Sequence, residues 1–428
     1  MEIYPKVHRN WPSEPVPCGW YGGQEFLEGR GYVQVPLGVV QVSGPGRLKW
    51  LELVTTQSVT GLRAGDSSEA LILDVKGHIE LAFYLVEDEE KTWILTEEPV
   101  ATRDFLEAMR FRSRVEIADV SDKFVVFGGI LFHELGKDSL FSDSANRLGA
   151  VEWLDPWPQT VGETTTFTPP GDPHIDLEEA LGVDCGGERV PLRVLEILPA
   201  SAAGEFRRVL ENFDFEETKL ETWEALRIAM WRPRLGREGM PGVLPHELDW
   251  LRTAVSLNKG CYTGQETVAK LVNRGRPPRR LVFLDFDGSS EEMPEIGSEI
   301  AVESSREKAG VLTSVAFHPL LGQIGLALVP RTLGTDEILL VEGSDGVVVR
   351  AAQTVIVDPS GENPKRFGGG KPGGALGLRG RGGAGGARGA GGVGGAGGTS
   401  NKKAGVTGGL GSGGTSGSIK VGLKGGAQ

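Results

Sequence analysis

Alternating hydrophobic and polar positions predict short strands and helices over the first third of the chain. The strand candidates are rich in β-branched and aromatic residues and are separated by polar turn clusters, as in hairpins. They are residues 32–44, 70–75, 78–86, 91–97 and 114–120. Helical spacing marks residues 47–56 and 101–111. Because strands and helices mix without strict alternation, we predict the α+β class rather than a doubly wound sheet.

A similar mixture follows a stretch rich in Pro, Gly, Thr and acidic residues at about 140–187, which we interpret as the junction between two lobes. Residues 192–199 have the pattern of a strand, and residues 201–213 that of a helix with Ser201 as its N-cap. In the next helix candidate, Trp223, Leu226 and Met230 share one face and Arg227 lies beside them, a stripe more typical of a core than of a cofactor contact.

From residue 281 onward the pattern changes to short strands bounded by Gly, Pro, Asp or Ser. Their even spacing predicts a small antiparallel β-barrel or sandwich at about 279–358. The strand candidates are residues 281–286, 298–303, 309–317, 324–329, 337–341 and 347–357.

The two ends of the chain differ from this body in composition. Residues 1–34 form a predicted irregular arm rich in Pro, Gly and aromatic residues. Residues 365–428 contain ten Lys or Arg and no acidic residue, and from Phe367 onward they hold 28 of the 64 glycines. Such a segment buries too little apolar surface to offset its ordering entropy, so we predict a disordered Gly-rich basic tail.

Charge and cysteine content exclude several classes of protein. With the tail set aside, the net charge of −13 becomes −23 for residues 1–364, which disfavours general nucleic-acid binding except weakly through the tail. Cys18, Cys185 and Cys261 have neither disulfide-framework nor metal-ligand spacing, so no metal site is predicted. Without a signal peptide or a long apolar run, we expect a soluble cytoplasmic protein with no membrane partner.

The stretch "NKGCYTGQET" at 258–267 concentrates reactive and polar groups between two helix candidates. Gly260 and Gly264 flank Cys261 and Tyr262, which predicts a sharp exposed turn. If a helix begins at Thr263 or Gly264, its positive end and Lys259 would favour the thiolate form of Cys261. The alternative is structural: a lone cysteine is usually a small buried hydrophobe, Tyr262 a packing residue, and Gln265 and Glu266 a polar first turn.

A basic cluster at residues 270–280 follows this stretch and includes Arg280. In an acidic body it favours a small anionic ligand, carboxylated or phosphorylated, although a solvated face stays open as an alternative.

The octamer Lys259-Gly-Cys-Tyr-x-Gly-Gln-Glu266 resembles the K-G-C-[FY]-x-G-Q-E signature of the YgfZ-type folate-binding proteins, which are relatives of the GcvT aminomethyltransferase. The resemblance extends, in the family's order, over about residues 35–358 and includes "WEALRIAMWRPRLGRE" and "PHELDWLRTAVSLNKGCYTGQETVAKLVNRGRPPRRLVFLDFDG". It implies a GcvT-like multi-domain ring around a folate cavity at 35–278, with the barrel after it.

The resemblance also implies a function. It indicates a protein that binds tetrahydrofolate or a one-carbon derivative and assists iron–sulfur cluster assembly or repair, with iron–sulfur proteins as partners. Cys261 would be the functional thiol. The residues implied in folate binding are Arg227, Lys259, Gly260, Tyr262, Gly264, Gln265, Glu266 and Arg280.

Two departures from the family pattern bear on activity. Where the aminomethyltransferases carry G-G-x-x-D-D, "GHIELA" places Leu81 and Ala82 at the acidic positions, which disfavours glycine-cleavage chemistry. The relatives' Y-T-G-E-x-G stretch, whose glutamate anchors the pterin, is not visible in "GGERVPLRVLEILP". A folate-dependent aminomethyl or methyl transferase, and a nucleic-acid-associated factor acting through its tail, are the alternative functions.

Overall fold

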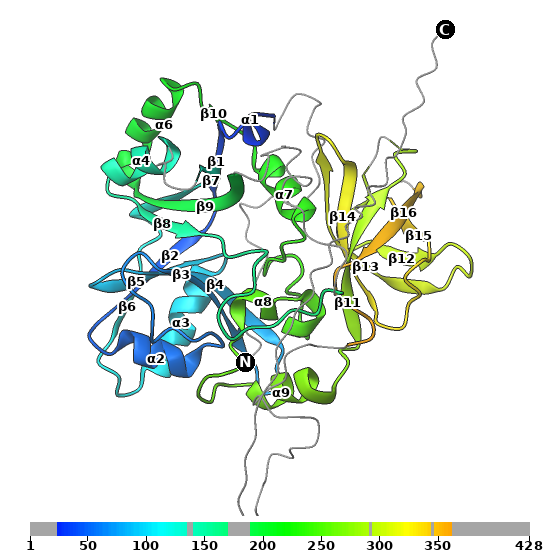
Figure 1. Cartoon of the computed structure of the whole chain (residues 1–428), viewed down its shortest axis with the longest axis horizontal. Helices are drawn as coiled ribbons and strands as arrows, with labels where there is room; N and C mark the ends of the chain where they lie inside the picture. Colours follow the sequence, from blue (N-terminus) through cyan, green and yellow to red (C-terminus); the bar gives the residue numbers. More distant parts are fainter. Residues whose placement is uncertain (1–23, 135–139, 170–188, 291–292, 344–345, 362–428) are drawn as a thin grey trace, which may run out of the picture. The chain divides into compact units, whose positions relative to one another are not determined.

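The computed structural model describes residues 24–134, 140–169, 189–290, 293–343 and 346–361. They belong to one compact unit, Met1–Gly374. The predicted tail and most of the predicted arm lie outside the described residues, as does part of the predicted junction at 140–187. Figure 1 shows the described elements coloured along the chain.

Five antiparallel strands in the order β3-β4-β5-β2-β6 form the first sheet. They are β2 (Gly38–Ser43), β3 (Ser67–Leu73), β4 (Ile79–Glu87), β5 (Lys91–Thr96) and β6 (Glu116–Asp119). Helices α2 (Arg47–Val54) and α3 (Pro99–Arg110) accompany this sheet. The predicted hairpins from β3 to β5 are confirmed, because β4 pairs with both neighbours in antiparallel register.

The second sheet has the order β10-β1-β7-β9-β8. Its strands are β1 (Gly31–Val35), β7 (Phe124–Glu134), β8 (Val151–Leu154), β9 (Arg189–Pro199) and β10 (Glu216–Glu217). The prediction of one strand over 32–44 is wrong, because the chain leaves the second sheet after β1 and enters the first sheet as β2. Pro36 lacks the N–H that a continuous ladder needs, and Leu37 N donates to Val35 O at 2.8 Å in a tight turn.

Helices α1 (Gln24–Leu27), α4 (Leu140–Arg147) and α6 (Ala203–Glu211) belong with the second sheet. The predicted N-cap at Ser201 is also wrong. Residues Ala200–Ala202 form a 3₁₀ turn (η1), so α6 begins at Ala203 and its N-cap, Ala202, makes no side-chain capping bond.

The C-terminal strands close into a six-stranded barrel, which decides between the barrel and the sandwich predicted for this region. The order is β11-β14-β13-β12-β15-β16, and every pairing is antiparallel. The strands are β11 (Arg279–Phe286), β12 (Glu299–Val302), β13 (Lys308–His318), β14 (Gly322–Pro330), β15 (Leu339–Glu342) and β16 (Val348–Val355).

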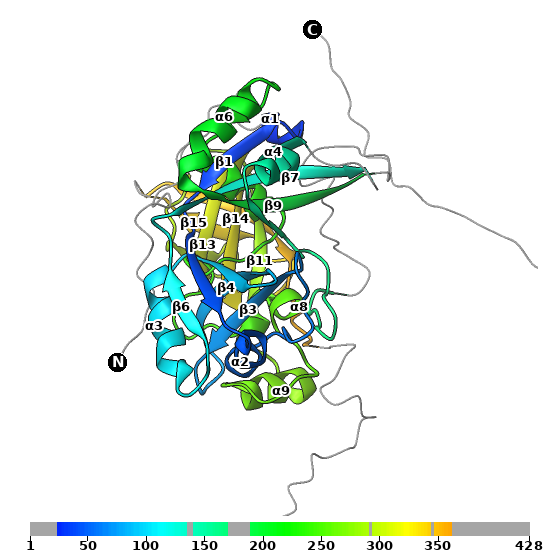
Figure 2. The same cartoon turned by 90° about the vertical axis from the view of Figure 1, so that its left-hand side faces the viewer.

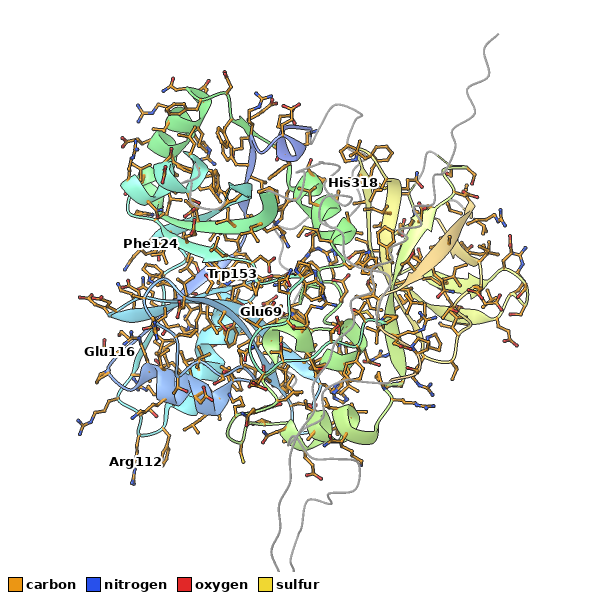
Figure 3. All side chains as sticks on the ribbon, viewed as in Figure 1. Glu69, Arg112, Glu116, Phe124, Trp153 and His318 are labelled. Carbon is orange, nitrogen blue, oxygen red and sulfur yellow. The ribbon has the colours of Figure 1, made fainter. Side chains whose placement is uncertain are left out.

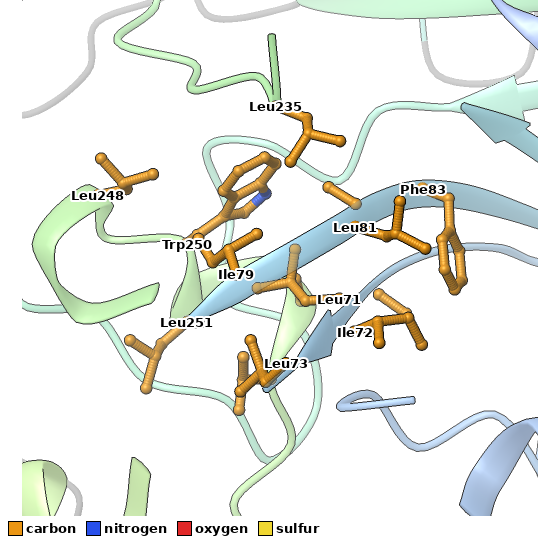
Figure 4. Close-up of a cluster of buried hydrophobic side chains, with 14 of the residues drawn as sticks. Leu71, Ile72, Leu73, Ile79, Leu81, Phe83, Leu235, Leu248, Trp250 and Leu251 are labelled. Carbon is orange, nitrogen blue, oxygen red and sulfur yellow. The ribbon is translucent and has the colours of Figure 1, made fainter. Parts of the chain in front are cut away.

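Helical segments join the sheets to the barrel. They are α7 (Leu220–Ala229), η2 (Pro245–Leu248), α8 (Leu251–Ala254) and α9 (Gln265–Arg274). Helix α7 packs against β13 and β14, and α8 packs against β3. Figure 4 shows Trp250 and Leu251 beside apolar side chains of β3 and β4, and Leu248 belongs to the same buried cluster. No helix among the described residues combines the length and the apolar character needed to cross a bilayer.

Candidate functional site

A small, partly open pocket is lined by residues from both sheets, from α7 and from the loops beside them. Tyr84 on β4 and Trp153 on β8 supply one aromatic wall, with their ring centroids 4.4 Å apart and their planes at 33°. Trp153 Nε1 donates to Ser68 O at 2.9 Å, which fixes the indole. Trp153 is labelled near Glu69 in Figure 3. Such surfaces suit a flat ring better than a flexible aliphatic ligand.

Trp223 on α7 forms a second aromatic surface of the pocket. It packs against Gly128 of β7, where an added Cβ would lie 2.9 Å from the indole. Gly128 is therefore the residue that lets α7 approach the second sheet closely enough to close the pocket.

Three arginines and three carboxylates also line the pocket, and they are paired with one another. Arg227 is 2% exposed and its guanidinium bonds Glu224 at 2.9 and 3.1 Å, Glu238 at 3.1 Å and Ser314 of β13 at 2.7 Å. Arg234 pairs with Glu224 at 3.1 Å and with Glu97. These contacts tie the end of β5 and helix α7 to the barrel.

The ion pairs fix the protonation of Glu224. Burial alone raises the pKa of this carboxyl, but Arg227 and Arg234 outweigh it and lower the pKa to about 2. Glu224 is thus an anion near neutral pH and cannot act as a general acid there.

Lys259 of the octamer makes structural contacts within the fold. Its Nζ donates to three backbone carbonyls at and beyond the end of α2, Glu52 O at 2.6 Å, Thr55 O at 2.7 Å and Gln57 O at 2.9 Å. Burial lowers the pKa of this ammonium to about 8, while Glu52 favours the charged form. Lys259 therefore works as a clamp between the octamer and the end of α2, and Figure 2 shows α2 and α9 at the same end of the structure.

The predicted turn is present, and one of its two glycines has the predicted backbone freedom. Gly264, the residue before α9, has φ +82°, whereas Gly260 has no positive φ. Cys261 is exposed, as are Thr263 and Glu266, and Gln265 is half-buried. Tyr262 is 8% exposed, and burial raises the pKa of its phenol. The octamer thus displays a thiol on a turn held from beneath.

The predicted site residues occupy three places. Arg227 lines the pocket, the octamer lies at the start of α9, and Arg280 is buried in the barrel on β11, where it donates to Leu333 O at 3.2 Å and Gln353 Oε1 at 3.0 Å. The octamer and Arg280 are not among the pocket-lining residues. Sequence reasoning missed Tyr84, Trp153, Arg193 and the paired carboxylates, which are scattered along the chain and share no local motif.

Comparisons with known proteins agree with this architecture. The chain is 24% identical over 317 residues, 72% of its length and 85% of the relative's, to a tRNA-modifying protein YgfZ of Hamiltonella defensa. It is 25% identical over 292 residues to a transferase-like chloroplastic protein of Arabidopsis thaliana, of whose length it spans 59%. A further match, 26% identical over 121 residues and 24% of the relative, is an iron–sulfur cluster assembly factor IBA57 homolog of Candida glabrata.

Among solved structures, the glycine cleavage system aminomethyltransferase T of Bartonella henselae superposes with a TM-score of 0.57. At 16% identity it covers 78% of this chain and 88% of the other, which shows a common fold. No family model matches the chain. The chain is thus similar in sequence to YgfZ proteins over most of its length and shares the fold of the GcvT aminomethyltransferase.

In this YgfZ/GcvT-like chain, the positions expected to be acidic in an aminomethyltransferase are core positions. Leu81 and Ala82 of β4 are 1% and 7% exposed and belong to the apolar cluster shared with α8. Among the described residues, no group of three His, Cys, Asp or Glu side chains is placed to hold a metal ion.

Proposed function

We propose that this YgfZ/GcvT-like chain binds tetrahydrofolate or a one-carbon derivative in the pocket and assists iron–sulfur cluster assembly or repair. The pocket itself carries the proposal. Aromatic surfaces at Tyr84, Trp153 and Trp223 suit a pterin ring, and guanidinium groups suit the carboxylates of its glutamate tail. The iron–sulfur part is supported by the YgfZ and IBA57 names of the relatives and by the displayed thiol of Cys261.

The binding step is tested by calorimetric titration of reduced tetrahydrofolate into the full chain. We expect saturable binding that Arg227→Ala weakens. Because Arg227→Ala removes an ion-pair partner from two buried carboxylates, Leu37→Trp is the second variant. Leu37 lines the pocket and makes none of the ion pairs, so a larger side chain there should block the ligand. Leu53→Trp, at a 64% exposed position on α2, is the control. No heat with the wild type would refute folate binding.

The iron–sulfur step is tested separately in cells that lack the protein, by the activity of an enzyme that depends on an iron–sulfur cluster. Cys261→Ser should fail to restore that activity while the purified variant binds tetrahydrofolate as the wild type does. Full restoration by Cys261→Ser would remove the thiol from the proposal.

A folate-dependent transferase is the weaker candidate, because the pocket carboxylates Glu97, Asp155 and Glu224 are all ion-paired with arginines. For Glu224 the pairing lowers the pKa to about 2, which makes this carboxylate a poor proton acceptor. Formation of product from tetrahydrofolate and an aminomethyl donor would reverse this ranking.

A further inference from the structure

The three guanidinium groups of the pocket are not equally satisfied. Arg227 and Arg234 each bond two carboxylates. Arg193, on β9, is 8% exposed, and among the described residues the single hydrogen bond of its guanidinium runs from Nη1 to Asp155 Oδ2 at 3.4 Å. Its Nε is buried and has no acceptor within the described part of the chain.

Asp155 cannot make up this deficit, because it serves other donors. Its carboxylate accepts from Arg232 Nε at 3.3 Å and from the backbone N–H of Trp157 at 3.0 Å, and it forms an ion pair with Arg232 Nη2 at 3.2 Å. A buried guanidinium with one long hydrogen bond is costly to the empty protein unless something else accepts from it.

Packing nevertheless holds Arg193 at the pocket. Its guanidinium carbon lies 4.2 Å from the ring centroid of Trp223, which backs one face of the planar group. Burial lowers the pKa of Arg193, and Asp155 offsets only part of that effect. The side chain is therefore kept in place by an aromatic surface that offers its N–H groups no acceptor.

We propose that Arg193 is the specificity-determining residue of the pocket and that it binds an acceptor oxygen of the ligand. The proposal rests on the proposed function and deepens it. The ligand is a planar heteroaromatic compound that presents a carboxylate or a ring carbonyl to the guanidinium, with its ring near Tyr84 and Trp153. Arg193 therefore presents a hydrogen-bond donor in the pocket from β9.

The test compares the full chain carrying Arg193→Met or Arg193→Lys with the wild type by calorimetric titration of tetrahydrofolate. A charge-assisted hydrogen bond corresponds to a roughly 10- to 100-fold change in affinity. We expect Arg193→Met to lose affinity by about that factor and Arg193→Lys to recover part of it. Arg207→Met is the matched control, because Arg207 also stacks on an aromatic ring, that of Phe127 at 4.9 Å, but does not line the pocket.

Melting temperatures without ligand separate recognition from packing. Removing a poorly satisfied charge in favour of an apolar side chain of similar length is close to neutral for stability, so the empty Arg193→Met protein should melt near the wild type. A lower melting temperature with unchanged affinity would assign Arg193 a structural role and overturn the proposal. Absence of any folate binding by the wild type would overturn both this inference and the proposed function, whereas wild-type binding that Arg193→Met leaves intact overturns the inference alone.

A parallel titration identifies the acceptor. Tetrahydrobiopterin has the pterin carbonyl but no glutamate, so equal losses for it and for tetrahydrofolate on Arg193→Met would place the ring carbonyl at Arg193. A loss confined to tetrahydrofolate would place a tail carboxylate there.

Discussion

Gly264 is expected to be the least replaceable residue of the octamer. Its φ of +82° is a conformation that costs an L-residue about 1 kcal/mol. An added Cβ would also lie 2.7 Å from Asp74 O and 3.0 Å from Gly77 Cα, in the turn between β3 and β4. Backbone atoms cannot rotate away as a side chain can, so overpacking adds roughly 1–3 kcal/mol. We therefore expect Gly264→Ala to lower the free energy of unfolding by about 3 kcal/mol.

Gly260→Ala is the matched control, four residues earlier in the same turn. No heavy atom lies within 4 Å of its added Cβ, and its φ is not positive, so we expect a change below about 0.5 kcal/mol. Both variants are compared with the wild type by urea unfolding followed by tryptophan fluorescence. Equal costs for the two substitutions, or a cost below about 1 kcal/mol for Gly264→Ala, would show that backbone crowding at Gly264 does not limit substitution there.

Two further predictions concern stability and pH. Lys259→Met leaves three carbonyl acceptors without their donor and should lower the free energy of unfolding in urea by about 3 kcal/mol. The control Lys270→Met, at an exposed position of α9, should change it very little. Equal effects of the two substitutions would contradict the clamp. Burial, aided by Glu97, raises the pKa of Glu98 to about 7. The folded protein therefore binds the Glu98 proton more tightly than the unfolded chain does. This contribution to the free energy of unfolding is complete below about pH 4.5 and is lost as the pH rises towards 7. The melting temperature of Glu98→Gln should therefore fall less between pH 5 and 8 than that of the wild type. Identical pH profiles for the two proteins would refute the raised pKa of Glu98.

The sequence predicts the element types well because local signals and tertiary packing agree over most of the body. The hairpins of the first sheet and the strands of the barrel have alternating patterns and turn residues, and both are confirmed. The wrong predictions arise where a single residue or turn changes the local backbone conformation. Pro36 divides a hydrophobic run that reads as one strand, and a 3₁₀ turn displaces the start of α6 past Ser201.

The pocket is less predictable than the fold, because tertiary structure alone assembles it. The stripe of Trp223, Leu226 and Met230 is buried, as expected of a core, although Trp223 also lines the pocket. Arg227 beside it is fully buried too, which requires partners as distant in sequence as Ser314. The octamer, by contrast, is one continuous segment, so its turn could be predicted locally. The acceptors of Lys259 could not, since they lie about 200 residues away on and after α2.

The octamer packs on the turn before β4, and the same strand contributes a residue to the pocket. No side-chain contact joins the octamer to the pocket in the described part of the chain, so their roles can be tested separately. Gly264 packs on the turn before β4, and Tyr84 of the same strand lines the pocket. Cys261 is exposed and lies outside the pocket lining, whereas Leu37 lies within it. Effects at sites without shared partners are usually additive. The double variant Cys261→Ser with Leu37→Trp should therefore bind tetrahydrofolate as weakly as Leu37→Trp alone. A further loss in calorimetry would show that the thiol turn and the pocket are coupled through β4.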